Sequence, residues 1–341
     1  MSTSFIGIDV HKCNCVFSEI DARGKIIRRG RFGNNLAEVS DFGSSLKGGE
    51  QVVVEPVLNY LWLLDQLEER AGSVHVATPY KVRVIAESKC KTDKYDARIL
   101  AELLRTDFLP ESYIPPRAIR ELRLLIRRRF GLVKLVVMLK NRVRHLLFLE
   151  GVDLVVADVS SAKAEREIKR LYISQSLRSW IEECVEILRF VAPRVKALEK
   201  ELEAYCQGMA EVALLRTIPG VGPIWAAVIY AEVADIRRFR SRKAFAGYTG
   251  LVPSVRSSGE STRLGDITHL GSRPLRTALL EASMTTVKSS PALYRMYARI
   301  SYRRVWQTAQ VAVARKLAII IYAMLKNGEP FRLPKRTKSM K

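Results

Sequence analysis

Two acidic side chains stand at the ends of short apolar stretches of the chain. Asp9 follows residues 5–8 (FIGI), and Glu55 follows residues 52–54 (VVV). A carboxylate at the end of a buried strand costs desolvation free energy unless a cation or hydrogen-bond donors compensate its charge. If the two strands lie side by side, both carboxylates meet at one end of a sheet. Each acid taken singly is more often structural, for example where it closes a turn.

Two further acids, Asp93 and Asp96, are three positions apart at the start of a predicted helix, so they share one face of it. Four hard oxygen donors from three elements suit one or two Mg²⁺ or Mn²⁺ ions. Such ions can activate a nucleophile and stabilise a leaving oxygen in phosphodiester cleavage. The structural alternatives are a helix cap at Asp93 and an ion pair of Asp96 with Lys94 or Arg98. The joint pattern, rather than any one acid, predicts a metal site.

The elements that must position these acids alternate between strands and helices over residues 1–110. The order βββαβαβα favours a mixed sheet with helices on its faces. Strands are expected at 5–10, 13–20, 26–32, 51–55 and 73–77, helices at 36–46, 58–71 and 93–104, and a turn at Pro79.

A long basic helix is predicted over residues 117–149, with ten basic side chains and one acid, Glu121. A second helix is expected at about 160–208, and its apolar spacing predicts an antiparallel coiled coil or helical hairpin with the first. A run of charge is usually only a solvated face. Here the imbalance favours contact with nucleic-acid phosphates. The candidate contacts are Arg120, Arg123, Arg127, Lys134 and Arg142.

The remainder of the chain is expected to form a compact, mostly helical domain that opens with a helix, a glycine-rich turn and another helix. Gly220 and Gly222 let backbone N–H groups approach a phosphate at the second helix, as in a helix-hairpin-helix motif. A plain turn between helices is an equal alternative. The basic end of the chain is expected to be disordered. The predicted domains are 1–110, 111–210 and 211–330, followed by the tail 331–341.

A segment rich in serine, glycine and arginine, residues 254–263, is expected to be a loop. A serine hydroxyl is a weak nucleophile until a base or a metal activates it. His269 is the nearest candidate base, and the carboxylate site is the better activator if the two domains meet. Neither His269 nor His11 has a partner at the spacing of metal ligands. The arginines that could hold a phosphate are Arg256, Arg263, Arg273 and Arg276.

The charge balance restricts the partners. The 341 residues include 57 Lys and Arg against 35 Asp and Glu, a net charge of +22. Such a charge attracts polyanions, so nucleic acid is the leading partner and an enzyme of small metabolites is disfavoured. There is no run of 18 uncharged apolar residues and no signal peptide is expected, so we predict no membrane partner. The five scattered cysteines disfavour a disulfide scaffold and favour a cytoplasmic protein.

The acidic stretches resemble the DEDD motif of transposases of the insertion sequence 110 family, which includes the Piv-type DNA invertases. The resemblance implies an N-terminal RuvC-like domain of the ribonuclease H fold, in which the four acids bind divalent metal. Residues 56–59 depart from the small, Gly-containing stretch that is usual there, without touching a carboxylate. The matching stretches are residues 7–12 (GIDVHK), 54–60 (VEPVLNY) and 91–98 (KTDKYDAR).

The C-terminal part resembles the transposase domain of the same family, and the resemblance implies that Ser258 is a nucleophile that links covalently to DNA. Ser257 is the alternative, and Ser254 is a weaker one. The similar stretches are 218–222 (IPGVG), 250–253 (GLVP), 258–259 (SG) and 271–276 (GSRPLR).

Three functions are compatible with these features. The first is a site-specific recombinase of an insertion element, acting in the cytoplasm on the nucleoid. The resemblance implies guidance by a structured noncoding RNA that pairs with donor and target double-stranded DNA. It also implies a homo-oligomer, a dimer or tetramer, whose active sites combine the acids of one subunit with the serine of another.

The second function is a metal-dependent junction-resolving nuclease that uses the four carboxylates and water, with no role for Ser258. The third is a non-catalytic nucleic-acid-binding relative. The presence of all four acids and of the serine motif argues against the third.

Overall fold

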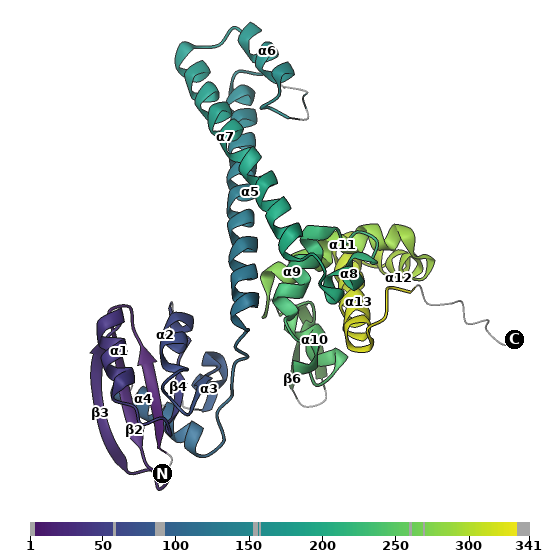
Figure 1. Cartoon of the computed structure of the whole chain (residues 1–341). Helices are drawn as coiled ribbons and strands as arrows, with labels where there is room; N and C mark the ends of the chain where they lie inside the picture. The colour runs from purple at the N-terminus through teal and green to yellow at the C-terminus, as the bar shows by residue number, and fades with distance from the viewer. Residues whose placement is uncertain are drawn as a thin grey trace, which may run out of the picture. The chain divides into compact units, whose positions relative to one another are not determined.

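A computed structural model describes residues 4–56, 59–85, 93–152, 156, 158–258, 261–268 and 270–332 of the chain. The chain divides into two compact units, Met1–Ile114 and Pro115–Lys341. The first unit contains a mixed sheet with helices, and the second is mostly helical (Figure 1). Of the tail 331–341 that was predicted to be disordered, residues 333–341 lie outside the described residues. The start of the tail is ordered, because the Phe331 N–H donates to the Thr217 hydroxyl at 2.8 Å.

The first unit is built on a five-stranded mixed sheet with the order β3-β2-β1-β4-β5, which confirms the predicted sheet. β1 pairs antiparallel with β2 and parallel with β4, and β4 pairs parallel with β5. Tight turns connect the antiparallel strands, whereas the parallel strands need helical crossovers. The strands are β1 (Phe5–Val10), β2 (Asn14–Ile20), β3 (Ile26–Gly33), β4 (Gln51–Val54) and β5 (Ser73–Val76).

Helices cover both faces of this sheet. The core on one face joins buried residues of β1 and β4 to α1 (Leu36–Ser44) and α2 (Tyr60–Leu67). On the other face Val53 packs with Leu100 of α4 (Asp93–Arg105). A strand buried on both sides reads as a continuous apolar run, which explains the three consecutive valines of β4.

A short helix, α3 (Pro79–Ile85), occupies the place where only a turn was predicted. The prediction was wrong because Pro79 was taken as a breaker. Proline is well tolerated in the first turn of a helix, where its missing N–H has no intrahelical partner to lose.

In the second unit α5 (Arg117–Leu149) lies alongside α7 (Gln175–Tyr205) (Figure 1). The predicted helix over 117–149 is confirmed. The prediction of one helix over 160–208 was wrong, because α6 (Ala162–Arg170) ends before α7 begins. The Ser174 hydroxyl accepts a hydrogen bond from the Leu177 N–H and caps α7. The Arg178 guanidinium donates to the carbonyls of Ile168 and Leu171, where α6 ends.

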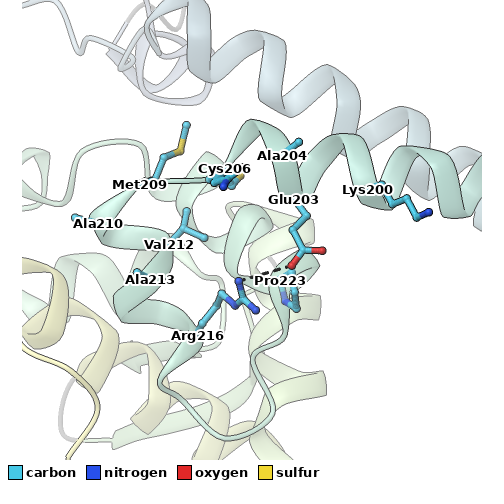
Figure 2. Close-up of a pocket in the computed structure, with 12 residues that line it drawn as sticks. Lys200, Glu203, Ala204, Cys206, Met209, Ala210, Val212, Ala213, Arg216 and Pro223 are labelled. Atoms are coloured by element: carbon cyan, nitrogen blue, oxygen red, sulfur yellow. Dashed lines mark ion pairs between the residues drawn. The ribbon is translucent and has the colours of Figure 1, made fainter.

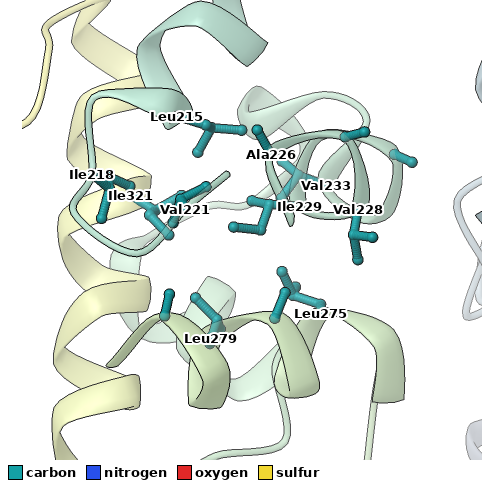
Figure 3. Close-up of a cluster of buried hydrophobic side chains, with 14 of the residues drawn as sticks. Leu215, Ile218, Val221, Ala226, Val228, Ile229, Val233, Leu275, Leu279 and Ile321 are labelled. Carbon is teal, nitrogen blue, oxygen red and sulfur yellow. The ribbon is translucent and has the colours of Figure 1, made fainter. Parts of the chain in front are cut away.

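The C-terminal core joins the end of α7 to a group of shorter helices. Figure 3 shows Leu215 and Ile218 on one side of this core and Leu275 and Leu279 on the other, with Ile321 between the helices. Side chains from distant parts of the sequence form a single buried cluster, so these helices share one hydrophobic core. The elements are α8 (Ala210–Arg216), α9 (Pro223–Val233), η1 (Ile236–Arg238), α10 (Arg242–Tyr248), α11 (Arg273–Ser289), α12 (Pro291–Ser301) and α13 (Trp306–Asn327).

Among the described residues, α13 is the helix that is long and apolar enough to cross a membrane by length and composition. Eight of its side chains are buried, and most of them belong to the C-terminal core. The apolar residues of α13 therefore pack in the core of the second unit.

A two-stranded hairpin interrupts the helices of the second unit. β6 (Pro253–Ser258) pairs antiparallel with β7 (Ser261–Ile267). The expectation of a loop over 254–263 was therefore wrong. Because the segment is mostly polar, it lacks the alternation of apolar and polar residues that usually marks a strand. The Ser-Gly pair at 258–259 was the one sequence feature that indicated a hairpin turn.

Candidate active site

Asp9 and Glu55 lie at the same end of two neighbouring parallel strands. Ile8 of β1 stands in register with Val54 of β4, and the Glu55 N–H donates to the Ile8 carbonyl at 3.1 Å. Asp9 is only 5% exposed, and Glu55 is half-buried. The strands lie side by side, as the prediction of a shared carboxylate edge requires.

Helix α4 runs antiparallel to β1. A Cβ added to Gly7 would lie 2.0 Å from the carbonyl oxygen of Ala97, so the helix backbone rests directly on the strand. At its other end the Arg105 guanidinium donates to the Ala22 carbonyl at 3.3 Å, in the turn beside the beginning of β1. The first turn of α4 therefore lies toward the end of β1, where Asp9 and Glu55 stand.

Alternation along β1 assigns Asp9 to the face that α4 covers. The even-numbered residues of β1 pack into the core under α1 and α2, whereas Gly7 meets α4. Asp9, two positions after Gly7, shares its face. Asp96 is half-buried and directly precedes Ala97, which touches Gly7. Asp93 begins α4, and its side chain lies outside the described residues.

Two groups lie in the neighbourhood of the Asp9 carboxylate. The Nε2 atom of His11 lies 3.3 Å from Oδ2 of Asp9. Burial, together with the charge of Asp9, raises the pKa of the Cys15 thiol to about 12. Cys15 is therefore a neutral, unreactive thiol at physiological pH. The structure places His11, a weak candidate for a metal ligand in the sequence, beside the Asp9 carboxylate.

A pair of asparagines braces this edge, and sequence reasoning missed it. Asn34 and Asn59 exchange side-chain hydrogen bonds at 3.0 and 2.8 Å. Asn34 also donates to the His11 carbonyl at 2.8 Å. The pair ties the turn after β1 to the residue before α2, so it steadies the segments that follow both Asp9 and Glu55. The only signal was that Asn59 lies in the stretch that departs from the family pattern.

The described part of the chain contains no group of three or more His, Cys, Asp or Glu side chains placed to hold a metal ion. It does bring two carboxylates together at the strand ends, with the first turn of α4 directed toward them. Carboxylates are the ligands that Mg²⁺ and Mn²⁺ take. The chemistry of these donors therefore fits a divalent cation, and the side chain of Asp93 would complete the predicted set.

The serine candidates lie on the hairpin. Ser258 ends β6 and pairs with Ser261, Arg256 pairs with Arg263, and Ser257 pairs with Thr262. The side chains of residues 255–264, and all of His269, lie outside the described residues.

Ser254 is placed differently from the other serines. It lies near the base of the hairpin, and a Cβ added to Gly265 would lie 2.6 Å from its hydroxyl oxygen. The Ser254 hydroxyl is therefore against the opposite strand, away from the Ser258 end of the hairpin.

Residues 271–276 anchor the base of this hairpin. Gly271 has φ +115°, and an added Cβ would lie 2.0 Å from the Tyr248 carbonyl oxygen. The Arg276 guanidinium donates to the Thr249 carbonyl at 3.3 Å. Both contacts hold the end of α10, which leads into β6. Arg273 is exposed and Arg276 is half-buried, so Arg273 is the more accessible phosphate contact of the two.

The glycine-rich turn between α8 and α9 is pressed against α11. Gly220 has φ +92°, and an added Cβ would lie 2.7 Å from Cβ of Thr285. The Thr286 hydroxyl donates to the Pro219 carbonyl at 2.7 Å. Gly222 begins α9 without a side-chain cap, and no atom of the described residues lies within 4 Å of its added Cβ. Gly220 thus serves packing, whereas Gly222 leaves the helix start open.

A cavity of about 600 Å³ lies beside this turn, lined by the end of α7, by α8 and by Pro223 (Figure 2). Lys200 and Arg216 lie on its wall. Glu203 pairs with Arg216 at 3.7 Å, as the dashed line marks. This acid offsets the positive charge of the wall, so the cavity is a mixed polar site rather than a strong anion site.

The predicted basic face of α5 is divided into internal and exposed side chains. The Arg123 guanidinium donates to the carbonyls of Ala231 and Glu232 at 2.8 and 3.2 Å, and the Glu232 carboxylate lies 4.0 Å away. Arg123 thus holds the end of α9. Arg120 is half-buried.

The remaining candidates on α5 reach the surface. Arg127, Lys134 and Arg142 are exposed, and the Arg142 guanidinium lies 5.5 Å from the ring centre of Trp180. These three side chains remain accessible to phosphates.

Comparison with known families assigns both parts of the chain to one class of protein. The family model described as "Transposase IS116/IS110/IS902 family" matches residues 212–298. A model described as "Transposase", for the DEDD transposases of IS110, matches residues 6–149. These matches identify a DNA transposase or recombinase. The chain therefore carries two transposase domains of the IS110 type, one in each matched stretch.

Related proteins of known description support this assignment. A "Probable family 20 transposase" of Pseudomonas aeruginosa is 26% identical, with 97% of this chain and 99% of the relative covered. The transposase for insertion sequence element IS1111A of Coxiella burnetii is 26% identical, over 96% of this chain and 91% of the relative. The pilin gene-inverting protein of Moraxella bovis is 25% identical, over 76% and 74%.

Proposed function

We propose that this transposase cuts and rejoins DNA through a covalent link to Ser258, with a Mg²⁺ or Mn²⁺ ion held by Asp9, Glu55, Asp93 and Asp96. One observation carries the proposal: Asp9, Glu55 and the first turn of α4 converge at one edge of the sheet. The proposed fold of the first domain, residues 1–110, is the RuvC-like form of the ribonuclease H fold.

The proposed chemistry is a phosphoryl exchange without net hydrolysis. A divalent cation bound by the carboxylates supplies Lewis acidity at the scissile phosphate. The Ser258 hydroxyl oxygen bonds to phosphorus and gives its proton to a base. The bond from phosphorus to one sugar oxygen breaks, and that oxygen takes up the proton returned by the base and leaves as a hydroxyl group. Attack by the hydroxyl of another strand reverses the exchange and releases the serine.

Arginines near the hairpin serve the phosphate in this scheme. Arg256, Arg263 and Arg273 neutralise the non-bridging oxygens, because guanidinium groups match phosphate geometry. Arg276 positions the hairpin through its bond to the Thr249 carbonyl.

The proposed partners are double-stranded donor and target DNA and a structured noncoding guide RNA. The net charge of +22 supports simultaneous binding of two polyanions. Gly222 and the exposed Arg127, Lys134 and Arg142 are the proposed backbone contacts in domains 111–210 and 211–330. We also propose a coiled-coil pairing of α5 with α7, a dimeric or tetrameric assembly, and action in the cytoplasm on the nucleoid.

The test is a search for a covalent protein–DNA species. The purified chain is incubated with Mg²⁺, element-end DNA and the element's flanking noncoding RNA, and the products are separated on a denaturing gel. Ser258→Ala should abolish the species, whereas Ser254→Ala, a matched serine at the hairpin base, should retain it. A species lost only in Ser257→Ala would move the nucleophile by one residue.

A second candidate function, a junction-resolving nuclease, is favoured by the same acids. It predicts cleaved DNA with no covalent species in any lane. Under the recombinase proposal, Asp9→Ala and Glu55→Ala should abolish strand exchange and leave DNA binding within about threefold. Loss of the folded state in both variants would instead assign the acids a structural role.

A further inference from the structure

The corner where α12 meets α13 exposes large aromatic rings. We define this corner as residues 291–306. Rings of this size normally bury much of their surface, and clustered exposure marks an interaction site. The most exposed rings are Tyr294 at 58%, Tyr302 at 90% and Trp306 at 56%.

Arginines alternate with these rings. Four arginines of the corner are exposed, and three of them repeat every four positions, so they follow one side of the helix and its continuation. They are Arg295, Arg299, Arg303 and Arg304.

The opposite side of α12 fixes the corner to the fold. Leu293 is buried with Val287 and Val313, and Tyr297 packs against the same cluster. The outward position of Tyr294 and Arg295 is therefore set by a packed inner face.

The turn between the two helices is held by its own backbone. The Tyr302 N–H donates to the Ala298 carbonyl at 3.0 Å, and the Arg304 N–H donates to the Ile300 carbonyl at 2.9 Å. An ordered turn presents its side chains without a large loss of conformational entropy on binding.

The charge around the corner has one sign. No acidic residue occurs between Glu281 and Glu329, a stretch that contains eight Lys and Arg residues. Such a stretch repels cationic partners and attracts phosphates. Aromatic rings interleaved with arginines are the combination that holds single-stranded nucleic acid, in which bases stack on the rings and phosphates meet the cations.

We propose that the corner binds an unpaired segment of the DNA strand, with bases stacked on Tyr302 and Trp306 and phosphates on Arg303 and Arg304. Bases in a duplex stack on one another and leave no face for a protein ring. Cutting and rejoining of strands, the activity of this family, requires strands to leave the duplex. The inference rests on DNA as the substrate, and it does not depend on the proposed serine chemistry.

The test measures binding by the full chain in EDTA, which removes the divalent cation that the proposed cleavage requires. Fluorescence anisotropy follows a labelled 20-nucleotide thymidine strand and a duplex of equal length. Tyr302→Ala and Trp306→Ala should each weaken single-strand binding about tenfold and duplex binding less than twofold. Tyr302→Phe and Trp306→Phe retain a ring and should stay within about twofold. Tyr172→Ala is the matched control, because Tyr172 is fully exposed at the turn before α7.

Four results would overturn the proposal. The Tyr302→Ala, Trp306→Ala double variant could keep its affinity for single-stranded DNA, or it could lose as much affinity for the duplex. It could also lose affinity for an RNA strand alone, or show a lower oligomeric mass in sedimentation. If the alanine variants fail to fold, Arg303→Gln with Arg304→Gln should weaken single-strand binding by a similar factor. Absence of a Ser258 adduct would leave these results intact, since binding is measured without metal.

Discussion

The arginines of α5 and those of the α12–α13 corner look alike in sequence and behave differently in the fold. Arg123 on α5 donates hydrogen bonds to the carbonyls at the end of α9, and Arg129 pairs with Glu199 of α7 at 2.6 Å. The arginines of the corner are exposed on a stretch without acids.

This difference shows why a count of charges cannot locate a nucleic-acid surface. A guanidinium carries five donors, so it serves helix ends as readily as phosphates. The basic helix of the sequence contains both kinds, and only the neighbours of each arginine separate them. The corner was not predicted from the sequence, because its seven exposed rings and cations are spread over two helices and a turn.

Arg123→Ala should have the largest effect on stability. It leaves two carbonyls at the end of α9 without this donor and the 8%-exposed side chain of Glu232 without its cation. We expect a loss of about 2 kcal/mol in the free energy of unfolding, measured with urea. The matched control is Arg127→Ala, one turn further along α5, which should change stability by less than about 0.5 kcal/mol. Equal losses in both variants would erase the distinction between internal and exposed arginines.

Removal of the exposed α5 cations should change binding without changing stability. Arg127→Ala combined with Lys134→Ala should lower the slope of log affinity against log salt concentration by about 2, for duplexes of any sequence. Titrations of duplex DNA at four salt concentrations measure this slope. A slope that stays at its original value would mean that phosphates do not contact this face.

The smallest effect on stability is expected for the ion pair between the exposed Arg189 and Glu165. Hydrogen bonds from Lys169 and Arg189 lower the pKa of Glu165 from 4.5 to about 2. Because the pKa of Glu165 is lower in the folded state, its ionised carboxylate stabilises the folded protein above pH 4.5. This stabilisation disappears as the pH falls through about 2. Glu165→Gln should therefore lower Tm at pH 7 by no more than about 2 °C, and the difference should vanish near pH 2. A difference that grows in acid would contradict the ion pair.

Local pattern was enough to predict most elements of the fold. The strands of the first unit and the helix α5 follow from apolar spacing, since each buries residues that repeat at the period of its own backbone. The break between α6 and α7 was not predictable, because Arg178 ends α6 through contacts to backbone carbonyls that leave no mark on periodicity. The hairpin was not predicted for a different reason: its sequence is mostly polar, so no alternation of apolar residues marks its strands.

The candidate site was predictable to the extent that strands carry it. Asp9 and Glu55 end apolar runs, so their shared edge follows once β1 and β4 are neighbours. The direction of α4 was beyond the sequence, because it depends on the contact of Gly7 with Ala97 and of Arg105 with Ala22. The bracing by Asn34 and Asn59 joins residues 25 positions apart, and no spacing rule connects them.

The contact of Gly7 with α4 makes the position of that helix adjustable by mutation. The backbone of Gly7 lies directly against the backbone of α4, so no side chain separates the strand from the helix. Replacing Gly7 by alanine and then by larger residues would move α4 outward in steps while every carboxylate stays in the chain. The distance between the acids of β1 and those of α4 thereby becomes an experimental variable, which separates the need for an acid from the need for its exact location.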